Sequence, residues 1–261
     1  MELPILITLL IIVGFLSGIV STIAGIGGGV FFVSTMTLLF LIPIDIAVDT
    51  SIFVILFSSF SGFISYLRQK RTNLKLSLTF ASFSILGSVI TSIIFYFIPI
   101  ENHILRILFA ITLLVAALNM IYKIARARET GKFDAGFLIN DHNYKANFKK
   151  AIPLFMLAGF TTNLLGIGGG IVNTPTLNII LHFPIHNATA ISTSIIFFTA
   201  IYNVIIKSIF GQINYLVGLF LAIGSLLGSI FGAKISQKMP RIYLQLFVAI
   251  ILIILAINMF F

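Results

Sequence analysis

Two short glycine runs are the parts of this sequence whose residue types and spacing best suit chemistry. Each reads Gly-Ile-Gly-Gly-Gly, the first over residues 25–29 and the second over residues 166–170. Backbone N–H groups with no side chain beside them can approach an anion closely, and a helix that begins after such a run adds the positive end of its dipole. The two runs therefore predict a pair of anion-binding turns.

Hydroxyl and amide side chains accompany both runs, and no Lys or Arg lies in the middle of the long apolar stretches. A charged side chain at the centre of a membrane costs about 2.5–3.5 kcal/mol or more, so neutral donors would hold an anion without that cost. The alternative is that the glycines only allow close helix packing, but a five-residue match that occurs twice favours a site. The predicted substrate-binding residues are Gly25, Gly27, Gly28, Gly29, Thr50, Ser51, Asn163, Gly166, Gly168, Gly169, Gly170, Asn173, Thr174, Thr193 and Ser194.

The composition places these runs in a membrane protein. The 261 residues are 59% hydrophobic and 9% charged, with a mean hydropathy of +1.16, whereas soluble domains carry about 25% charged residues. Apolar runs long enough to cross a bilayer recur along the chain, which predicts an all-α polytopic protein. The net charge of +9 then indicates membrane sidedness rather than nucleic-acid binding, and the absence of cysteine excludes disulfides and thiolate metal sites.

The glycine runs fix the predicted course of the chain. Residues 3–42 contain no charged residue and would form about 60 Å of helix, twice what one crossing needs. Glycine inside a helix costs roughly 1 kcal/mol relative to alanine, so this stretch, and likewise residues 151–183, should fold back at its glycine run as a helical hairpin, either re-entrant or fully spanning. Further spans are predicted at residues 46–67, 76–98, 104–122, 188–206, 215–233 and 242–261.

An internal duplication relates the two halves. Gly25–Gly29 and Pro43 lie 141 residues before Gly166–Gly170 and Pro184, while the segment Thr50-Ser51-Ile52 matches Thr193-Ser194-Ile195 at an offset of 143. The expected organisation is a first transmembrane repeat over residues 1–122, a basic connector over residues 123–150 and a second repeat over residues 151–261. Each repeat would consist of a glycine-broken helical hairpin and three transmembrane helices.

The distribution of basic residues favours inverted repeats. If each glycine stretch folds back, all of the 16 Lys and Arg residues except Arg106 and Lys207 lie on one side, and the positive-inside rule makes that side cytoplasmic. The alternative of single crossings and parallel halves leaves Arg106, Lys234, Lys238 and Arg241 outside. The predicted location is the cell membrane, with the connector in the cytoplasm and both termini outside.

Several motifs give this sequence a resemblance to the sulfite exporter family TauE/SafE. Two G-x-G-G-G motifs open the halves, Pro175 follows the second by five residues, and Ala47–Ser51 and Ala190–Ser194 resemble the family's A-x-G-T-S motif. Ser34 stands where the first copy would carry the proline, and Asp49 and Ser192 stand in place of the motif's glycine. The resemblance covers essentially the whole chain and implies a secondary transporter of sulfur-containing anions such as sulfite or small organosulfonates.

Asp49 is the carboxylate nearest a span interior. It is a candidate for carrying a coupling proton, although a cap on a helix beginning near Ala47 is the favoured interpretation. Asn73 and Asn214 occupy equivalent loop positions and are predicted to cap the helices that follow. His182 and His186 are separated by Pro184 and have no third ligand nearby in the sequence, so a metal site is not expected.

Four other functions compete with a carrier of sulfur-containing anions. A channel-like anion pathway or a carrier of non-sulfur organic anions would use the same turns. A membrane-embedded enzyme would need clustered ionisable groups in the spans, which this sequence lacks. A structural subunit would not need duplicated glycine breaks. No cofactor is expected; the predicted partners are a small anion and the lipid bilayer, and the sequence does not distinguish a monomer from a homodimer.

Overall fold

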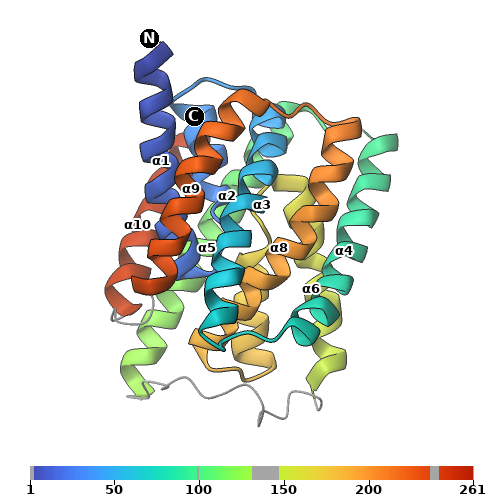
Figure 1. Ribbon diagram of the computed structural model, residues 1–261. Coiled ribbons are helices and arrows are strands. Elements are labelled where there is room, and N and C mark those ends of the chain that lie inside the picture. Colours follow the sequence, from blue (N-terminus) through green and yellow to red (C-terminus); the bar gives the residue numbers. More distant parts are fainter. Residues whose placement is uncertain (1–2, 99, 131–146, 236–240, 261) are drawn as a thin grey trace.

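The computed structural model describes residues 3–98, 100–130, 147–235 and 241–260, and within them the chain is helical without a strand (Figure 1). The elements are α1 (Leu3–Ala24), α2 (Gly29–Leu38), α3 (Ile44–Arg68), α4 (Leu74–Phe97), α5 (Asn102–Thr130), α6 (Phe148–Leu165), α7 (Gly170–Pro175), the π-helical turn η3 (Thr176–Ile180), α8 (Ile185–Phe210), α9 (Tyr215–Ile235) and α10 (Arg241–Phe260). The predicted all-α fold is confirmed.

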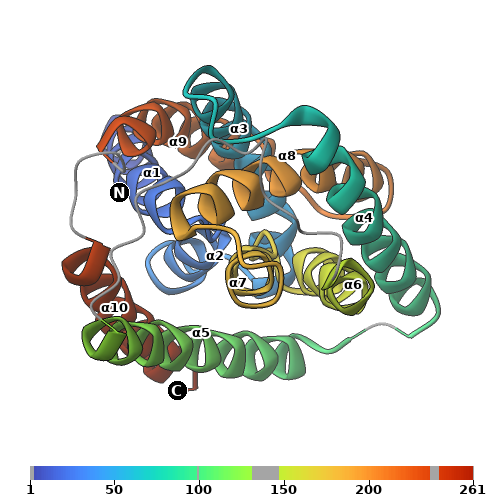
Figure 2. The same ribbon diagram turned by 90° about the horizontal axis from the view of Figure 1, so that it is seen from below.

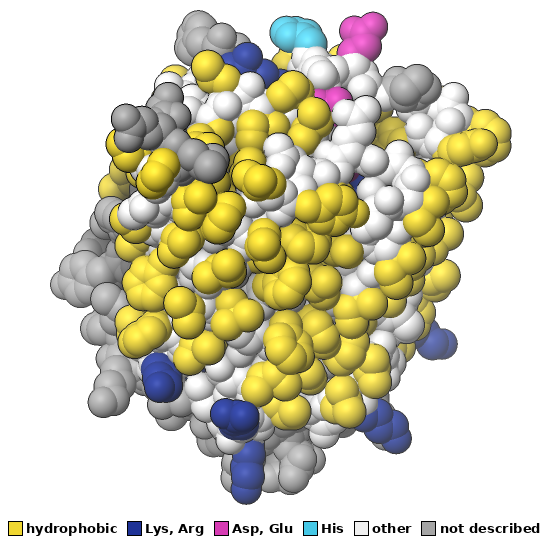
Figure 3. Space-filling model, turned by 45° about the horizontal axis from the view of Figure 1, so that its top comes forward, with side chains coloured by type: hydrophobic (Ala, Val, Ile, Leu, Met, Phe, Trp, Pro, Cys, Tyr) yellow, Lys and Arg dark blue, Asp and Glu magenta, His cyan; other side chains and the backbone are white. Residues whose placement is uncertain are grey.

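Five described helices, α1, α3, α4, α8 and α9, are long and apolar enough to cross a membrane. Large hydrophobic side chains are exposed along the outer faces of these helices, as expected where lipid replaces water. Figure 3 shows this hydrophobic surface over the middle of the molecule, with a group of Lys and Arg side chains at one end. The chain is therefore a multi-pass membrane protein.

Both glycine runs break a helix, as predicted. The first separates α1 from α2, and the second separates α6 from α7. Helix α2 has ten residues and is about 15 Å long, half the thickness of a bilayer core, so it is too short to cross a bilayer by itself. Seen along the bundle, α2 and α7 lie in the interior, surrounded by longer helices (Figure 2).

Equivalent helices of the two halves pack in the same way, each against a helix of the other half. Helix α1 packs mainly on α9, and its counterpart α6 packs on α4. At the first crossing a Cβ atom on Gly18 would meet the carbonyl of Ser225, and at the second a Cβ atom on Gly159 would meet the carbonyl of Ser84. These pairs are related by the offset of 141 residues with partners interchanged, which is the pattern a two-fold relation produces. Small residues allow both close crossings.

The ends of the chain lie where a fold-back in each half would put them. The N- and C-terminal ends lie toward one end of the bundle, whereas the end of α5 and the start of α6 lie at the opposite end (Figure 1). Helix α5 continues to Thr130 and so includes the first eight residues of the predicted connector; residues 131–146 and Lys238 fall outside the described residues. The orientation of the halves in a membrane stays a prediction.

Helices α3 and α8 begin in the same way. Pro43 and Pro184 occupy their N-cap positions with nearly identical backbone angles. Between α3 and α4, the side chain of Asn73 accepts a hydrogen bond from the N–H of Lys75, and before α9 the side chain of Asn214 accepts one from the N–H of Val217. Both asparagines therefore cap the helices that follow, as predicted.

Candidate functional site

The two glycine turns meet in the interior. A Cβ atom built on Gly27 would lie 3.2 Å from Cα of Gly168, and one built on Gly168 would lie 3.2 Å from Cα of Gly27. A Cβ atom on Gly29 would strike the carbonyl of Gly166, and one on Gly170 would strike the carbonyl of Gly25. Every residue of both runs is buried, so no side chain fits between the turns.

Backbone conformation also requires glycine at the centres of the turns. Gly27 and Gly168 have φ angles of +95° and +87°, in the region that side chains other than glycine's rarely adopt. Gly28 and Gly169, with φ angles of +76° and +71°, are the N-caps of α2 and α7. The two runs therefore form the same turn twice.

Donors and acceptors at the turns are used unequally. The carbonyl of Gly25 accepts hydrogen bonds from Thr174 Oγ1 and Ser192 Oγ, each at 3.0 Å. The carbonyl of Gly166 accepts one from Ser51 Oγ at 2.9 Å. Within the described part of the chain, the N–H groups of Gly27, Gly28 and Gly29 have no protein acceptor, as is usual for a first helical turn. The turns thus have occupied carbonyls and available N–H donors.

Ser51 and Ser192 are equivalent, which corrects the predicted alignment of these helices. Each donates its hydroxyl to a turn carbonyl of the other repeat, and they lie 141 residues apart, as do the two N-cap prolines. The offset of 143 that paired Ser51 with Ser194 is therefore wrong: no insertion precedes this segment, and the letters Thr-Ser recur two residues later in α8. Ser192 was not among the predicted site residues, although a constant offset of 141 from Ser51 could have found it.

Removing these hydroxyls should loosen the contact between the repeats. Both serines are fully buried, and a neutral hydrogen bond contributes about 0.5–1.5 kcal/mol. We expect Ser51→Ala and Ser192→Ala each to lower the free energy of unfolding by about 1 kcal/mol, measured by thermal unfolding in detergent. Ser82→Ala, which removes an exposed hydroxyl bonded within its own helix, should change it by a few tenths at most; equal losses in all three variants would contradict the assignment.

Asn173, one of the predicted site residues, is buried without a partner. It lies in the first turns of α7 with 1% of its surface exposed, and neither Nδ2 nor Oδ1 has a hydrogen-bond partner among the described residues. The hydroxyls of Thr22 and Ser34, beside the first run in sequence, are also buried and unpartnered. Buried polar groups are normally hydrogen-bonded, so the unpartnered amide of Asn173 is a candidate for binding a substrate at the glycine turns.

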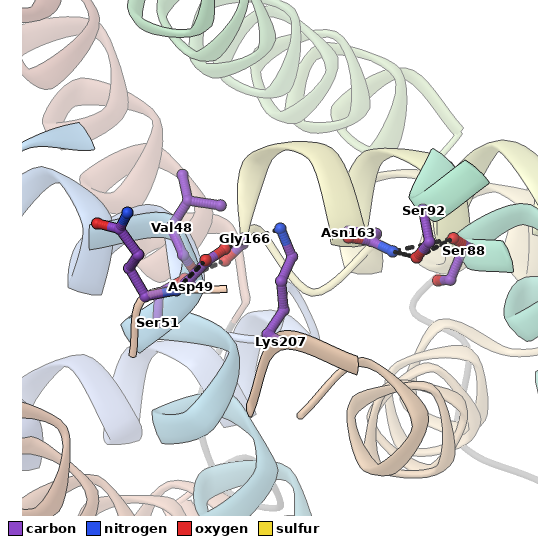
Figure 4. A network of polar contacts seen from close by, with 9 residues as sticks. Val48, Asp49, Ser51, Ser88, Ser92, Asn163, Gly166 and Lys207 are labelled. Atoms are coloured by element: carbon purple, nitrogen blue, oxygen red, sulfur yellow. Dashed lines mark hydrogen bonds and ion pairs between the residues drawn. The ribbon is translucent and has the colours of Figure 1, made fainter. Parts of the chain in front are cut away.

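The other four predicted side chains are engaged elsewhere. Asn163 Nδ2 donates to Ser88 O at 2.9 Å and Ser92 Oγ at 2.6 Å on α4 (Figure 4). Thr193 donates to a carbonyl of its own helix. Ser194 bonds its own helix and Thr72, and Thr50 accepts the N–H of Asn214 in the loop between α8 and α9. The structure therefore gathers the glycine runs, Ser51, Asn173 and Thr174 at the turns.

Asp49 does not cap its own helix. Helix α3 begins at Ile44 after the N-cap Pro43, which puts Asp49 in the second turn, so the favoured capping interpretation is wrong. Its carboxylate instead pairs with Lys207 Nζ of α8 at 2.8 Å and accepts the N–H of Gln212 at 2.9 Å (Figure 4). Lys207 was identified in the sequence only as one of two basic residues on the outer side; nothing local indicates its partner.

The described residues contain no group of three His, Cys, Asp or Glu side chains that could hold a metal ion. His182 lies in the turn between η3 and α8 with a φ angle of +56°, and His186 lies in the first turn of α8. The chemistry available at the glycine turns is therefore hydrogen bonding by neutral groups.

Comparison with known proteins agrees with this architecture. The family model described as sulfite exporter TauE/SafE matches residues 10–259. The chain is 28% identical to the probable membrane transporter protein YunE of Bacillus subtilis, over 95% of this chain and 94% of that protein. It is 32% identical to a probable membrane transporter protein of Methanocaldococcus jannaschii, over 96% and 94% of the two chains.

The similarity thus spans both glycine runs and all of the helices that hold them. No solved structure matches the chain. A family match over nearly the whole length, together with relatives named as membrane transporters, supports a transporter rather than a membrane enzyme. The chain belongs to the sulfite exporter TauE/SafE family of membrane transporters.

Proposed function

We propose that this transporter is a secondary carrier of small sulfur-containing anions, such as sulfite or small organosulfonates, and that it binds the anion at the paired glycine turns. The observation that carries the proposal is the meeting of two buried turns from the two repeats, with occupied carbonyls and N–H groups that have no protein acceptor in the described chain. Donors held this way can bind an oxyanion without a cationic side chain.

Neutral donors suit a carrier because the bound ion must also be released. A Lys or Arg at the turns would hold an anion strongly and would be costly at membrane depth. The described residues place no ionised side chain at the turns; the ion pair of Asp49 and Lys207 lies toward one end of α3 and α8. The proposed role of Asp49 as a carrier of a coupling proton stays a prediction.

Alternating access explains why the site is duplicated. In transporters built from inverted repeats, the substrate lies near the midplane and one repeat moves against the other. The reciprocal contacts of α1 with α9 and of α6 with α4 support such a relation here. We propose export as the direction because the family is described as one of exporters. In a secondary carrier, the gradients of the anion and of any coupled ion would determine the direction of net transport.

Counterflow tests the proposal. Proteoliposomes containing the purified protein would be loaded with unlabelled sulfite or a small alkanesulfonate, and the labelled anion would be offered outside. A carrier gives transient accumulation of label and a saturating rate, whereas a channel gives neither. Absence of counterflow with every sulfur oxyanion tested would contradict the proposed substrate class; linear, non-saturating flux would favour the channel.

Cysteine labelling tests the predicted orientation, since the native chain contains no cysteine. Lys75 and Glu101 are exposed at the two ends of α4. We expect Lys75→Cys to react with an impermeant thiol reagent only in inverted membrane vesicles and Glu101→Cys only in intact cells. The reverse pattern would overturn the predicted sidedness, and reaction of both from one side would contradict a spanning α4.

A further inference from the structure

We propose that the two ends of the transport path are closed by chemically different latches, an ion pair at one end and neutral hydrogen bonds at the other. The proposal rests on the proposed carrier function. It assigns Asp49 and Lys207 a gating role that follows from where they lie, at the end of the bundle where the loop between α8 and α9 crosses the start of α3.

The ion pair, which we call the charged latch, joins Asp49 of the first repeat to Lys207 of the second. The side chains of Asp49 and Lys207, at 2.8 Å, are only 10% and 21% exposed. The other carboxylate oxygen accepts the N–H of Gln212, and Thr50 Oγ1, one residue along, accepts the N–H of Asn214 at 2.9 Å. A Cβ atom on Gly211 would strike the carboxylate, so this loop lies directly against α3.

The equivalent loop at the opposite end joins α3 to α4. Thr72 Oγ1 lies 2.9 Å from Ser194 Oγ of α8, and Asn187 Nδ2 donates to the carbonyl of Arg71 at 3.3 Å. Gln212 and Asn214 correspond at the offset of 141 to Arg71 and Asn73, but Asp49 corresponds to Ala190. The two-fold relation therefore preserves the loop-to-helix contact and changes its chemistry.

This difference has a mechanical consequence. Removing one partner of a partly buried ion pair is strongly destabilising, because the charge left behind is poorly solvated. Opening at the charged end must separate the pair and hydrate both ions together, whereas the contacts described at the Thr72 end are neutral hydrogen bonds that water can replace. Removing a single charge should thus unfasten the charged end selectively.

A buried cysteine reports that opening. Ala200 lies on α8 two turns from Lys207 toward the centre, is fully buried, and belongs to the same apolar cluster as Val48 and Val217. Ser59, its counterpart at the offset of 141, is 3% exposed and is the matching reporter position for the Thr72 end. Ala200→Cys and Ser59→Cys, each alone in the cysteine-free chain, would be labelled by an impermeant thiol reagent added to either side of the membrane.

We expect Asp49→Asn and Lys207→Met each to raise the labelling rate of Ala200→Cys at least tenfold from the charged end, and the double variant to add little. Lys207→Arg, which keeps the charge, should stay within about twofold of the parent. Asp45→Asn, which removes a carboxylate one turn earlier on α3, should also have little effect, because Asp45 forms no ion pair with a described residue. Ser59→Cys should not react faster in any of these variants.

Unchanged labelling in both Asp49→Asn and Lys207→Met would overturn the proposal, as would an equal rise in Asp45→Asn. Faster reaction of both reporters from both sides, as general loosening would produce, contradicts a latch at one end. Labelling requires no substrate, so its outcome is separate from that of counterflow: failure of counterflow would remove the carrier function, and failure of selective labelling would remove only the latch.

Discussion

Alanine at position 29 or 170 is expected to abolish counterflow, to below about one-hundredth of the wild-type rate. The added methyl group of Gly29→Ala would strike the carbonyl of Gly166, which Ser51 holds in place, and that of Gly170→Ala would strike the carbonyl of Gly25, which Thr174 and Ser192 hold. Overpacking typically costs about 1–3 kcal/mol, and backbone cannot yield as a flexible side chain can. The two turns must then separate, and with them the N–H groups proposed to bind the anion.

Gly62→Ala is the matched control. Gly62 lies in α3, and a Cβ atom there would meet the methyl group of Thr193 at 2.9 Å and otherwise only ordinary contacts of 3.5 Å or more. That methyl group can shift, so we expect at least half of the wild-type counterflow. Size-exclusion chromatography in detergent establishes that each variant is folded. Wild-type counterflow by a folded Gly29→Ala or Gly170→Ala would remove the turns from the transport mechanism.

The fold could be predicted where local physical chemistry decides it. An uncharged stretch too long for one crossing and interrupted by four glycines must fold back near them, so both hairpins were predicted correctly. Helix ends were within a few residues of their observed positions because Pro43, Pro184, Asn73 and Asn214 mark them in the sequence. Where the predicted ends differ most, at residue 122, the apolar pattern stops while α5 continues to Thr130.

The site was harder to predict because hydrogen-bond partners are a property of the assembled bundle. Sequence shows that Ser51 and Thr174 carry hydroxyls, but not that those hydroxyls are used on glycine carbonyls of the other repeat. The ion pair joins Asp49 to a lysine 158 positions away, and no local pattern records such a partner. Ser192 was missed because the three-residue match of Thr50-Ser51-Ile52 with Thr193-Ser194-Ile195 was preferred to the constant offset of the duplication.

Replacing Asn173 by leucine is expected to stabilise the protein and to abolish its transport. A buried amide without partners costs about 1–3 kcal/mol relative to one that is hydrogen-bonded, and in the described structure both polar atoms of this side chain are unpartnered at 1% exposure. Leucine has a similar length and no polar atom to satisfy. We therefore expect the free energy of unfolding without substrate to rise by about 1 kcal/mol and counterflow to fall at least tenfold.

Asn163 is the matched comparison for Asn173, because the same substitution there is expected to change the free energy of unfolding in the opposite direction. It is equally buried, at 2%, but its amide donates to Ser88 O and Ser92 Oγ. Asn163→Leu should therefore remove two buried hydrogen bonds to α4 and lower stability by about 1–3 kcal/mol. If Asn173→Leu destabilised the protein as much, its amide would have a partner in the folded chain; if it transported normally, the amide would not touch the anion. Greater stability together with lost transport is the result expected of a side chain kept polar for its substrate.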